Sequence, residues 1–126
     1  FLEETTSDAG NPVVLFALEW CEFCWSVRKL MAAYAIPYRA IDLDSVAYQE
    51  ENRGGDIRAA IRERTGQRTI PQIFIGGEHI GGATEFFDAL KDGSAQTRLE
   101  ALGVEWNRAE DRDPYSFLPA WLHKRG

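Results

Sequence analysis

Hydrophobic residues along this chain form short strand-length runs that are separated by polar turns. Val13-Val-Leu-Phe-Ala-Leu18 is a continuous apolar run, which is typical of a strand buried on both faces. Residues 38–43 alternate between apolar and polar positions and predict a second strand. Residues 70–75 predict a third strand, and Gly76-Gly77 after it predicts a hairpin turn into a fourth strand from Glu78. The chain therefore carries four short predicted strands, of which the last two form a hairpin.

Apolar positions also repeat at helical spacing between and after these strands. Residues 22–34 carry such an apolar face and predict a helix soon after the first strand. Asp56 is a suitable N-cap for a second helix, which Gly66 is expected to end. Thr84 and Ser94 are expected to cap two further helices after the fourth strand. The predicted order is β-α-β-α-β-β-α-α.

This order predicts the fold class and the organisation of the chain. A β-α-β unit followed by a β-hairpin and covering helices is the layout of a thioredoxin-like α/β fold, a four-stranded mixed sheet flanked by helices. We expect residues 1–12 to form a flexible arm and residues 13–103 to form the domain. Residues 104–126 are rich in charges and aromatic side chains, so we expect this C-terminal extension to dock on the domain or on a partner.

Length and charge narrow the classes of function. The 126 residues suffice for one domain with a buried core. The formal net charge of −6 argues against nucleic acid or an anionic membrane as a partner. No apolar run approaches the roughly 20 residues that span a bilayer. The first residues lack the basic and apolar regions of a signal peptide, so we expect the cytoplasm or another reducing compartment.

Two cysteines, Cys21 and Cys24, are the candidate chemistry of the chain. A disulfide-stabilised secreted scaffold needs more cysteines, and His79 and His123 do not lie at the spacing of a zinc finger. A single C-x-x-C pair after a buried strand is typical of a redox-active dithiol. The alternative interpretations are two buried structural cysteines or half of a metal site.

The predicted position of the pair explains how it could be reactive. Cys21 follows the first strand at the start of a helix, where unpaired N–H groups and the helix dipole favour a thiolate and lower the thiol pKa. Cys24 lies one turn further along the same helix face, within reach of Cys21. We therefore expect Cys21 to be the nucleophile and Cys24 the resolving thiol. Glu22 opposes the effect, because a neighbouring carboxylate raises a thiol pKa.

Four segments together resemble the glutaredoxin family. They are Val13-Val-Leu-Phe, Trp20-Cys-Glu-Phe-Cys24, Thr65-Gly-Gln-Arg-Thr-Ile-Pro-Gln-Ile-Phe-Ile75 and His79-Ile-Gly-Gly-Ala-Thr84. The resemblance covers about residues 13–103. The Gly-Gly-Ala-Thr segment is similar to that of dithiol glutaredoxins that hold iron–sulfur clusters.

The resemblance implies roles for residues at the matched positions. Cys21 would attack a glutathione mixed disulfide, and Pro71 would have a cis peptide bond beside it. The Ile70 backbone would pair with the cysteinyl part of glutathione. The remaining glutathione contacts would come from Gln67 (to the glycine carboxylate), from Thr69 and from the site for the γ-glutamyl carboxylate formed by Gly82, Ala83 and Thr84. A helix N-terminus suits such a carboxylate on physical grounds as well.

Three positions depart from the family pattern. Many glutaredoxins carry a lysine three residues before the first cysteine, where this chain has Leu18, followed by Glu19. Glu22 stands where a proline is usual. Because these changes remove positive charge or add negative charge near an anionic tripeptide, we expect weaker glutathione binding, a less depressed thiol pKa or a different preferred substrate.

Three functions follow as hypotheses. In the first, the chain is a glutathione-dependent oxidoreductase that reduces protein disulfides or protein–glutathione mixed disulfides, and its partners are glutathione and those proteins. In the second, two chains bridge a [2Fe–2S] cluster through Cys21 of each chain and two glutathiones. In the third, the chain is a redox module of a larger protein. A monomer is expected for the enzyme, and a dimer for the cluster-bound form.

Overall fold

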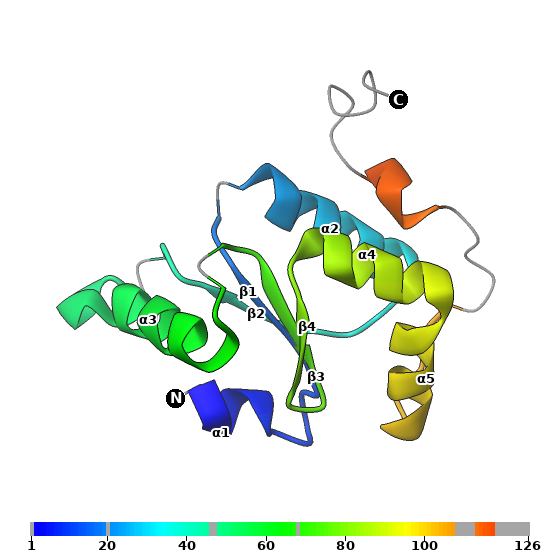
Figure 1. Cartoon of the computed structure of the whole chain (residues 1–126), viewed down its shortest axis with the longest axis horizontal. Coiled ribbons are helices and arrows are strands. Elements are labelled where there is room, and N and C mark those ends of the chain that lie inside the picture. Colours follow the sequence, from blue (N-terminus) through cyan, green and yellow to red (C-terminus); the bar gives the residue numbers. More distant parts are fainter. Residues whose placement is uncertain (1, 20, 46–47, 68, 108–112, 118–126) are drawn as a thin grey trace.

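The computed structural model describes residues 2–19, 21–45, 48–67, 69–107 and 113–117 (Figure 1). Its helices are α1 (Leu2–Thr6), α2 (Glu22–Ala33), α3 (Arg53–Thr65), α4 (Ala83–Asp92) and α5 (Ser94–Ala101). Its strands are β1 (Val13–Ala17), β2 (Arg39–Asp42), β3 (Gln72–Ile75) and β4 (Glu78–Gly81). Two short 3₁₀ helices, η2 (Glu50–Asn52) and η3 (Pro114–Phe117), complete the described elements. None of the helices in these described ranges has the length and apolar character that crossing a membrane requires.

The four strands form one mixed sheet in the order β2-β1-β3-β4. β1 runs parallel to β2 and antiparallel to β3, and β3 forms an antiparallel hairpin with β4. The hairpin turn is made by Gly76 and Gly77, whose φ angles of 61° and 82° are the left-handed values that a tight hairpin turn needs. The four-stranded mixed sheet flanked by helices confirms the predicted thioredoxin-like fold.

Helices cover both faces of the sheet, with α2 and α4 on one side and α3 on the other (Figure 1). Alternate residues of β1 divide between the two faces because strand side chains point to opposite sides. Val13, Leu15 and Ala17 join the core beneath α2, α4 and α5, whereas Val14 and Phe16 join the core beneath α1 and α3. All five β1 residues are buried, as the continuous apolar run predicts.

The expected flexible arm contains a short helix instead. Leu2, Thr5 and Thr6 of α1 are buried, and Leu2 packs into the core beneath α3. A polar-looking sequence conceals this helix, because one apolar residue and two threonine methyl groups supply its buried face. The N-terminal segment is therefore part of the folded domain from Leu2 to Thr6.

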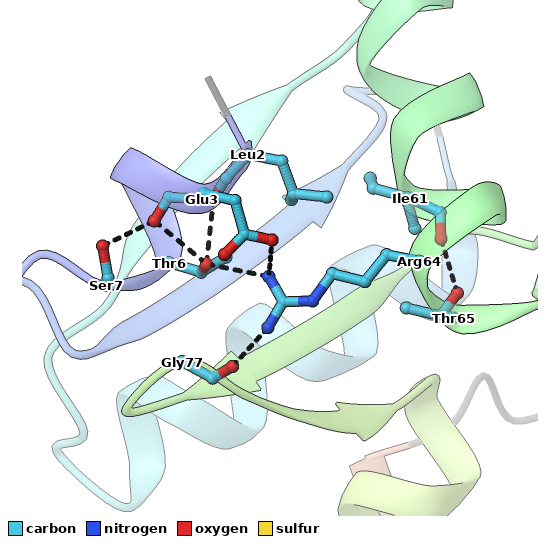
Figure 2. Close-up of polar contacts among 8 residues, drawn as sticks. All are labelled: Leu2, Glu3, Thr6, Ser7, Ile61, Arg64, Thr65 and Gly77. Carbon is cyan, nitrogen blue, oxygen red and sulfur yellow. Dashed lines mark hydrogen bonds and ion pairs between the residues drawn. The ribbon is translucent and has the colours of Figure 1, made fainter.

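Arg64, near the end of α3, ties α1 to the β3–β4 hairpin (Figure 2). Its Nη1 atom lies 3.2 Å from Thr6 Oγ1 and 3.1 Å from Glu3 Oε1. Its Nη2 atom donates to the Gly77 carbonyl oxygen at 2.7 Å. The guanidinium also lies 5.1 Å from the centre of the Phe74 ring. One side chain thus joins three segments that are distant in the sequence.

Three helices begin at other residues than expected. α3 begins at Arg53, ahead of Asp56, because Gly54 allows its first turn to approach the Leu43 carbonyl oxygen, where an added Cβ would lie 2.1 Å away. α4 begins after Gly82, so Thr84 lies inside its first turn. α5 begins at Ser94 itself, since Gly93 (φ 86°) ends α4 and starts α5 without a linker. Gly66, the residue expected to end α3, is confirmed as the C-cap that follows Thr65, with a φ of 77°.

The described part of the C-terminal extension docks on the domain. The Trp106 ring stacks on the Tyr34 ring with centroids 6.4 Å apart and an interplanar angle of 25°. The Asn107 N–H donates to the Tyr34 carbonyl oxygen at 2.6 Å. η3 packs against α2 and α4, and its Phe117 is buried in the core. Docking on the domain is therefore observed for residues 104–107 and 113–117, whereas residues 108–112 and 118–126 lie outside the described residues.

Candidate active site

The predicted site residues gather at one end of the sheet, because three strands end or begin there. β1 runs toward Cys21, and its Phe16 lies opposite Gln72, the first residue of β3. Ile73 lies opposite Gly81, the last residue of β4. The connections that follow β1, precede β3 and follow β4 consequently meet at this end. They carry the dithiol, the Ile70-Pro71 bond and the start of α4, respectively.

Cys21 is the N-cap residue of α2, with extended backbone angles (φ −144°, ψ 120°). Its Sγ atom accepts a hydrogen bond from the Cys24 backbone N–H at 3.4 Å. Such a donor at a helix N-terminus stabilises a negatively charged sulfur. The side chain is half-buried, so the sulfur is accessible to a reaction partner. This geometry agrees with the position that the sequence predicts for the nucleophile.

Cys24 lies in a different environment only one turn away. Its side chain is fully buried in the core beneath α2. Burial, followed by a hydrogen bond with Cys21, raises the pKa of the Cys24 thiol to about 12. The two sulfurs are not joined in a disulfide. The pair therefore consists of one accessible sulfur and one buried, protonated thiol.

Leu18 and Glu19, which directly precede the dithiol segment, supply no positive charge beside it. Leu18 is half-buried against the core beneath α3, and Glu19 is exposed. The Glu19 backbone N–H donates to Asp44 Oδ1 at 2.8 Å, which fixes the loop that precedes the dithiol. The guanidinium of Arg28, on the second turn of α2, forms an ion pair with Asp42 at the end of β2. That cation is therefore partly neutralised within the domain.

Pro71 and the start of α4 lie against each other. The Ile70-Pro71 peptide bond is cis, as the resemblance implies, and Pro71 is buried. A Cβ added at Gly82 would lie 3.3 Å from the Pro71 carbonyl oxygen, which is tighter than most side chains allow. Gly81 has a φ of 129°, a value that L-residues with a side chain rarely adopt. The Gly-Gly pair is thus required for this approach.

The first turn of α4 already holds a carboxylate of its own. Glu85 Oε1 accepts from the Gly82 N–H at 3.2 Å, and the Thr84 hydroxyl donates to the other Glu85 oxygen. The Thr84 hydroxyl, followed by the Gly82 N–H, holds the pKa of the Glu85 carboxyl below its usual value. Thr84 itself is exposed, and Ala83 is buried. The sequence places Glu85 near the positive end of this helix but does not predict that its carboxylate occupies the Gly82 N–H, although a Glu three residues after a helix start is a known capping signal.

Gln67 and Thr69 are held by a residue that the sequence analysis did not single out. Gln72 Nε2 lies 2.9 Å from Gln67 Oε1 and 2.9 Å from the Thr69 carbonyl oxygen. Gln72 Oε1 lies 2.6 Å from His79 Nε2 on β4. The side chain of Gln72 is fully buried. A sequence signal existed, because Gln72 is a polar residue inside the apolar run Ile70-Pro-Gln-Ile-Phe-Ile75.

Metal ligands are sparse in the described part of the chain. No group of three or more histidine, cysteine or acidic side chains is placed there to hold a metal ion. One half-buried thiol, Cys21, is the cysteine that an external metal could reach. The described residues therefore fit a bridging cluster only if the other ligands come from a second chain and from free thiols.

Comparison with known proteins gives a consistent result. A family model described as Glutaredoxin matches residues 13–80. A glutaredoxin from Solanum lycopersicum is 46% identical over 96 residues, which cover 76% of this chain and 84% of that protein. A glutaredoxin from Vernicia fordii is 43% identical over 96 residues, which cover 76% of this chain and 88% of that protein.

Solved structures agree with these sequence relatives. The crystal structure of a buckwheat glutaredoxin–glutathione complex superposes with a TM-score of 0.70 and 37% identity, and covers 80% of this chain and 86% of that one. A wheat glutaredoxin crystal structure superposes with a TM-score of 0.69 and 36% identity, and covers 79% of this chain and 88% of that one. The similarity therefore extends over most of each chain.

Proposed function

This chain belongs to the glutaredoxin family and is a thiol–disulfide oxidoreductase, and we propose that it reduces glutathione mixed disulfides of proteins, with Cys21 as the nucleophile. The observation that carries the proposal is the contrast between the two thiols. Cys21 is accessible at the N-terminus of α2 and accepts the Cys24 N–H, whereas Cys24 is fully buried. Only one sulfur is therefore positioned to meet a substrate.

The first step transfers the glutathionyl group. The Cys21 thiolate attacks the glutathionyl sulfur of a protein–S–S–glutathione bond. The sulfur–sulfur bond of the substrate breaks, the protein thiolate leaves with the electron pair and takes a proton from solvent, and a Cys21–glutathione disulfide forms. The protein substrate is thus reduced by two electrons, and Cys21 now carries glutathione.

The second step can follow two routes. The thiolate of a second glutathione attacks the glutathionyl sulfur, which releases glutathione disulfide and regenerates the Cys21 thiolate. Alternatively, Cys24 attacks Cys21 Sγ, which releases glutathione and leaves a Cys21–Cys24 disulfide that glutathione later reduces. The second route requires the Cys24 thiol, which is fully buried, to lose its proton and reach Cys21 Sγ. We therefore propose that external glutathione is the main resolving thiol and that Cys24 has an accessory role.

A glutathione site beside Cys21 follows from the positions of the matched residues. Gln67 and Thr69 lie on the connection that leads to Pro71, and the start of α4 lies against Pro71. We propose that Gln67 binds the glycine carboxylate, that the Ile70 backbone pairs with the cysteinyl residue, and that the N–H groups of Ala83 and Thr84 bind the γ-glutamyl carboxylate. The buckwheat glutaredoxin in complex with glutathione supports a glutathione site in this fold.

Two features of the site weaken this binding. Glu85 occupies the Gly82 N–H and adds a negative charge beside the proposed γ-glutamyl site. Glu22 is exposed next to Cys21. Both charges repel an anionic tripeptide, so we propose a higher KM for glutathione than a site with a lysine before the first cysteine would show.

Single-cysteine variants test the proposal. We expect Cys21→Ser to abolish reduction of a glutathionylated peptide, since no other accessible thiol is described. We expect Cys24→Ser to retain most of the activity, because external glutathione resolves the mixed disulfide. The measurement is the initial rate of release of the free peptide thiol at varied glutathione concentration. Equal loss in both variants would contradict the glutathione route, and full activity of Cys21→Ser would contradict the nucleophile assignment.

A dimer that bridges a [2Fe–2S] cluster remains the alternative proposal for the same thiol. One accessible cysteine per chain fits this arrangement, and Glu22 in place of proline distinguishes the chain from typical dithiol glutaredoxins. When bound, such a cluster supplies electron transfer or a transferable iron–sulfur group. Anaerobic reconstitution with iron, sulfide and glutathione tests it. A coloured dimer that loses its colour when glutathione is removed would support it, and a colourless monomer would contradict it.

A further inference from the structure

We propose that Gln72 is a positioning residue that orients the Gln67 amide so that its NH₂ group is presented to the glycine carboxylate of glutathione. The inference rests on the proposed glutathione site and assigns part of its specificity to a residue that does not touch the ligand. Gln72 is fully buried, whereas Gln67 is half-buried and Thr69 is exposed. The loop that carries Gln67 and Thr69 is therefore held by a side chain from the interior of the domain.

Gln72 differs from the other buried polar residues of the described chain. Those are Thr5, Thr6 and Ser26. The Thr6 and Ser26 hydroxyls donate to carbonyl oxygens four residues earlier in their own helices, at 2.9 Å and 3.1 Å. Thr6 Oγ1 also accepts from Arg64 Nη1 of α3. Gln72 is the one of these four residues that bonds to the proposed glutathione site, since it joins the loop at Gln67 and Thr69 to His79 on β4. Its side chain thus connects two separate segments across the start of β3.

The neighbours of Gln72 determine which way its amide points. The Thr69 carbonyl oxygen can only accept a hydrogen bond, so the atom 2.9 Å from it must be the Gln72 NH₂ nitrogen. The amide oxygen then faces His79 Nε2 at 2.6 Å, and that nitrogen must carry a hydrogen. His79 therefore donates to Gln72, and Gln72 donates to the loop. Reversing the Gln72 amide would place oxygen against oxygen.

Gln72 also fixes the orientation of the Gln67 amide, which is the group that would meet the ligand. Gln67 Oε1 lies 2.9 Å from the Gln72 NH₂ nitrogen and acts as the acceptor. The part of the Gln67 amide that remains for a ligand is its NH₂ group, which has two N–H donors. A carboxylate has only acceptors and needs such donors. Without Gln72, the Gln67 amide could rotate and present its oxygen, which would repel a carboxylate.

Burial gives this arrangement its strength. The Gln72 amide is itself buried, so its N–H and C=O groups are satisfied by these protein partners and not by water, whereas the partners lie on half-buried or exposed residues. Gln72 satisfies the Thr69 carbonyl oxygen, Gln67 Oε1 and the His79 N–H together. An apolar residue at this position would leave all three without that partner. The orientation of Gln67 is thus fixed before a ligand arrives, and binding does not have to select it.

The experiment compares two substitutions at Gln72 with a matched control. In Gln72→Met, the methionine side chain is similar in size to glutamine but lacks the amide groups that donate to Gln67 and Thr69 and accept from His79. Gln72→Glu keeps an acceptor for His79 but cannot donate to Gln67 when ionised. Thr6→Val is the control, because it also removes a buried hydrogen-bonding group, in this case a hydroxyl. Thr6 lies on α1, beside Arg64 (Figure 2). Each variant is assayed for kcat and KM with a peptide–glutathione mixed disulfide, and thermal unfolding confirms that it is folded.

We expect both Gln72 variants to raise KM for the mixed disulfide about tenfold, the loss of roughly one hydrogen bond to a charged group, with kcat within about twofold. We expect Thr6→Val to leave KM unchanged. A second substrate, whose glycine carboxyl group is converted to an amide, isolates the contact. The wild-type protein should lose affinity for it by the same factor, and the Gln72 variants should then no longer differ from the wild type.

A double-mutant cycle closes the argument. In a Gln67→Ala background, Gln72→Met should change KM by less than twofold, because Gln72 acts through Gln67. The proposal would be overturned if the KM increases of Gln67→Ala and Gln72→Met multiplied in the double variant. An unchanged KM in Gln72→Met alone would overturn it as well. So would an equal KM increase for the amidated substrate, which would indicate general disruption. If the wild-type protein shows no saturable turnover of the glutathione mixed disulfide, the proposed function itself fails, which is a separate outcome.

Discussion

The two thiols of the site lie one helical turn apart but differ in how far they are buried. Cys21 is half-buried, and Cys24 has no exposed surface and a thiol pKa raised to about 12 by that burial and by the hydrogen bond with Cys21. The ionised form of Cys24 is therefore negligible at neutral pH. A sulfur that stays protonated is a poor nucleophile.

Alkylation of the reduced protein measures this difference directly. At pH 8 we expect iodoacetamide to add one carbamidomethyl group rapidly, at Cys21, and a second one at least about tenfold more slowly, since the thiolate is the reacting species. Peptide mass spectrometry identifies the modified residue, and Cys21→Ser supplies the matched control for Cys24 alone. Comparable rates at the two cysteines would contradict the assigned environments.

His79 provides a pH-dependent contribution to stability. Burial, and next the positive charge of Arg64, lower the pKa of the His79 imidazole, while Glu85 acts in the opposite direction. The unfolded chain consequently binds a proton at a higher pH than the folded one. The contribution is complete above the unfolded value of about 6.5 and is lost as the pH falls toward the folded value.

Denaturant unfolding at several pH values checks this sign. We expect the free energy of unfolding of the wild-type protein to decrease between about pH 7.5 and pH 5 relative to that of His79→Gln, which keeps a donor toward Gln72 but does not titrate. All other titrating groups are common to both proteins and cancel in the difference. A difference that does not change with pH, or that grows in favour of the wild type, would contradict a lowered imidazole pKa.

Among the structural elements, α1 is joined to the hairpin mainly through the guanidinium of Arg64. It bridges Thr6, Glu3 and the Gly77 carbonyl oxygen, and it lies over the Phe74 ring. A lysine has one compact charge and cannot reach both sides of this arrangement.

Replacing Arg64 with lysine should therefore destabilise the protein. We expect Arg64→Lys to lower the free energy of unfolding by about 1 kcal/mol, which is the net value of a typical lost hydrogen bond. Arg62→Lys, at an exposed position on the same helix, is the control and should change it by less than about 0.5 kcal/mol. Chemical denaturation measures both, and equal stabilities of the two variants would contradict the bridging role.

The strands, the order of elements and the dithiol helix follow from the sequence because their signals are local. The apolar run of β1, the glycine pair of the hairpin and Gly66 at the end of α3 each determine a feature by themselves. The starts of α3, α4 and α5 depend on what packs against them. Gly54 against the Leu43 carbonyl oxygen is such a contact, and no pattern in a single segment reveals it.

The candidate site shows the same division. The C-x-x-C spacing, together with its place after a buried strand and before a helix, identifies Cys21 and Cys24 as the candidate dithiol. Gln72 was missed because its partners lie on a loop and on β4, which meet only in the folded sheet. Glu85 binds the local partners Gly82 and Thr84, and the sequence indicates its place near the helix start but not its effect on the site. The short helix α1 was missed for a different reason, since Leu2 alone among its residues is a large apolar side chain.

The folded core of the molecule includes parts of the chain that lie beyond the family match. The match ends at residue 80, yet α4, α5 and η3 all contribute to the core beneath α2. Phe117 is 8% exposed and closes that core, whereas Leu102 is 45% exposed.

Substitution of these two residues tests whether the extension is structural. We expect Phe117→Ala to lower the free energy of unfolding by about 3 kcal/mol, a usual loss for a buried aromatic side chain. Leu102→Ala should lower it by less than about 1 kcal/mol, because most surface positions contribute little. Thermal and denaturant unfolding measure both variants. Similar values for the two would indicate that the extension does not stabilise the domain.

The order of the strands has a consequence for how this protein avoids unwanted association. Its sheet ends on both sides in strands of four residues, β2 and β4. The first carries Arg39 and Asp42, and the second carries Glu78, which forms an ion pair with Arg98 of α5. Short, charged outer strands are poor templates for a foreign strand. Both edges of the sheet therefore discourage the strand-to-strand pairing that leads to fibrous aggregation.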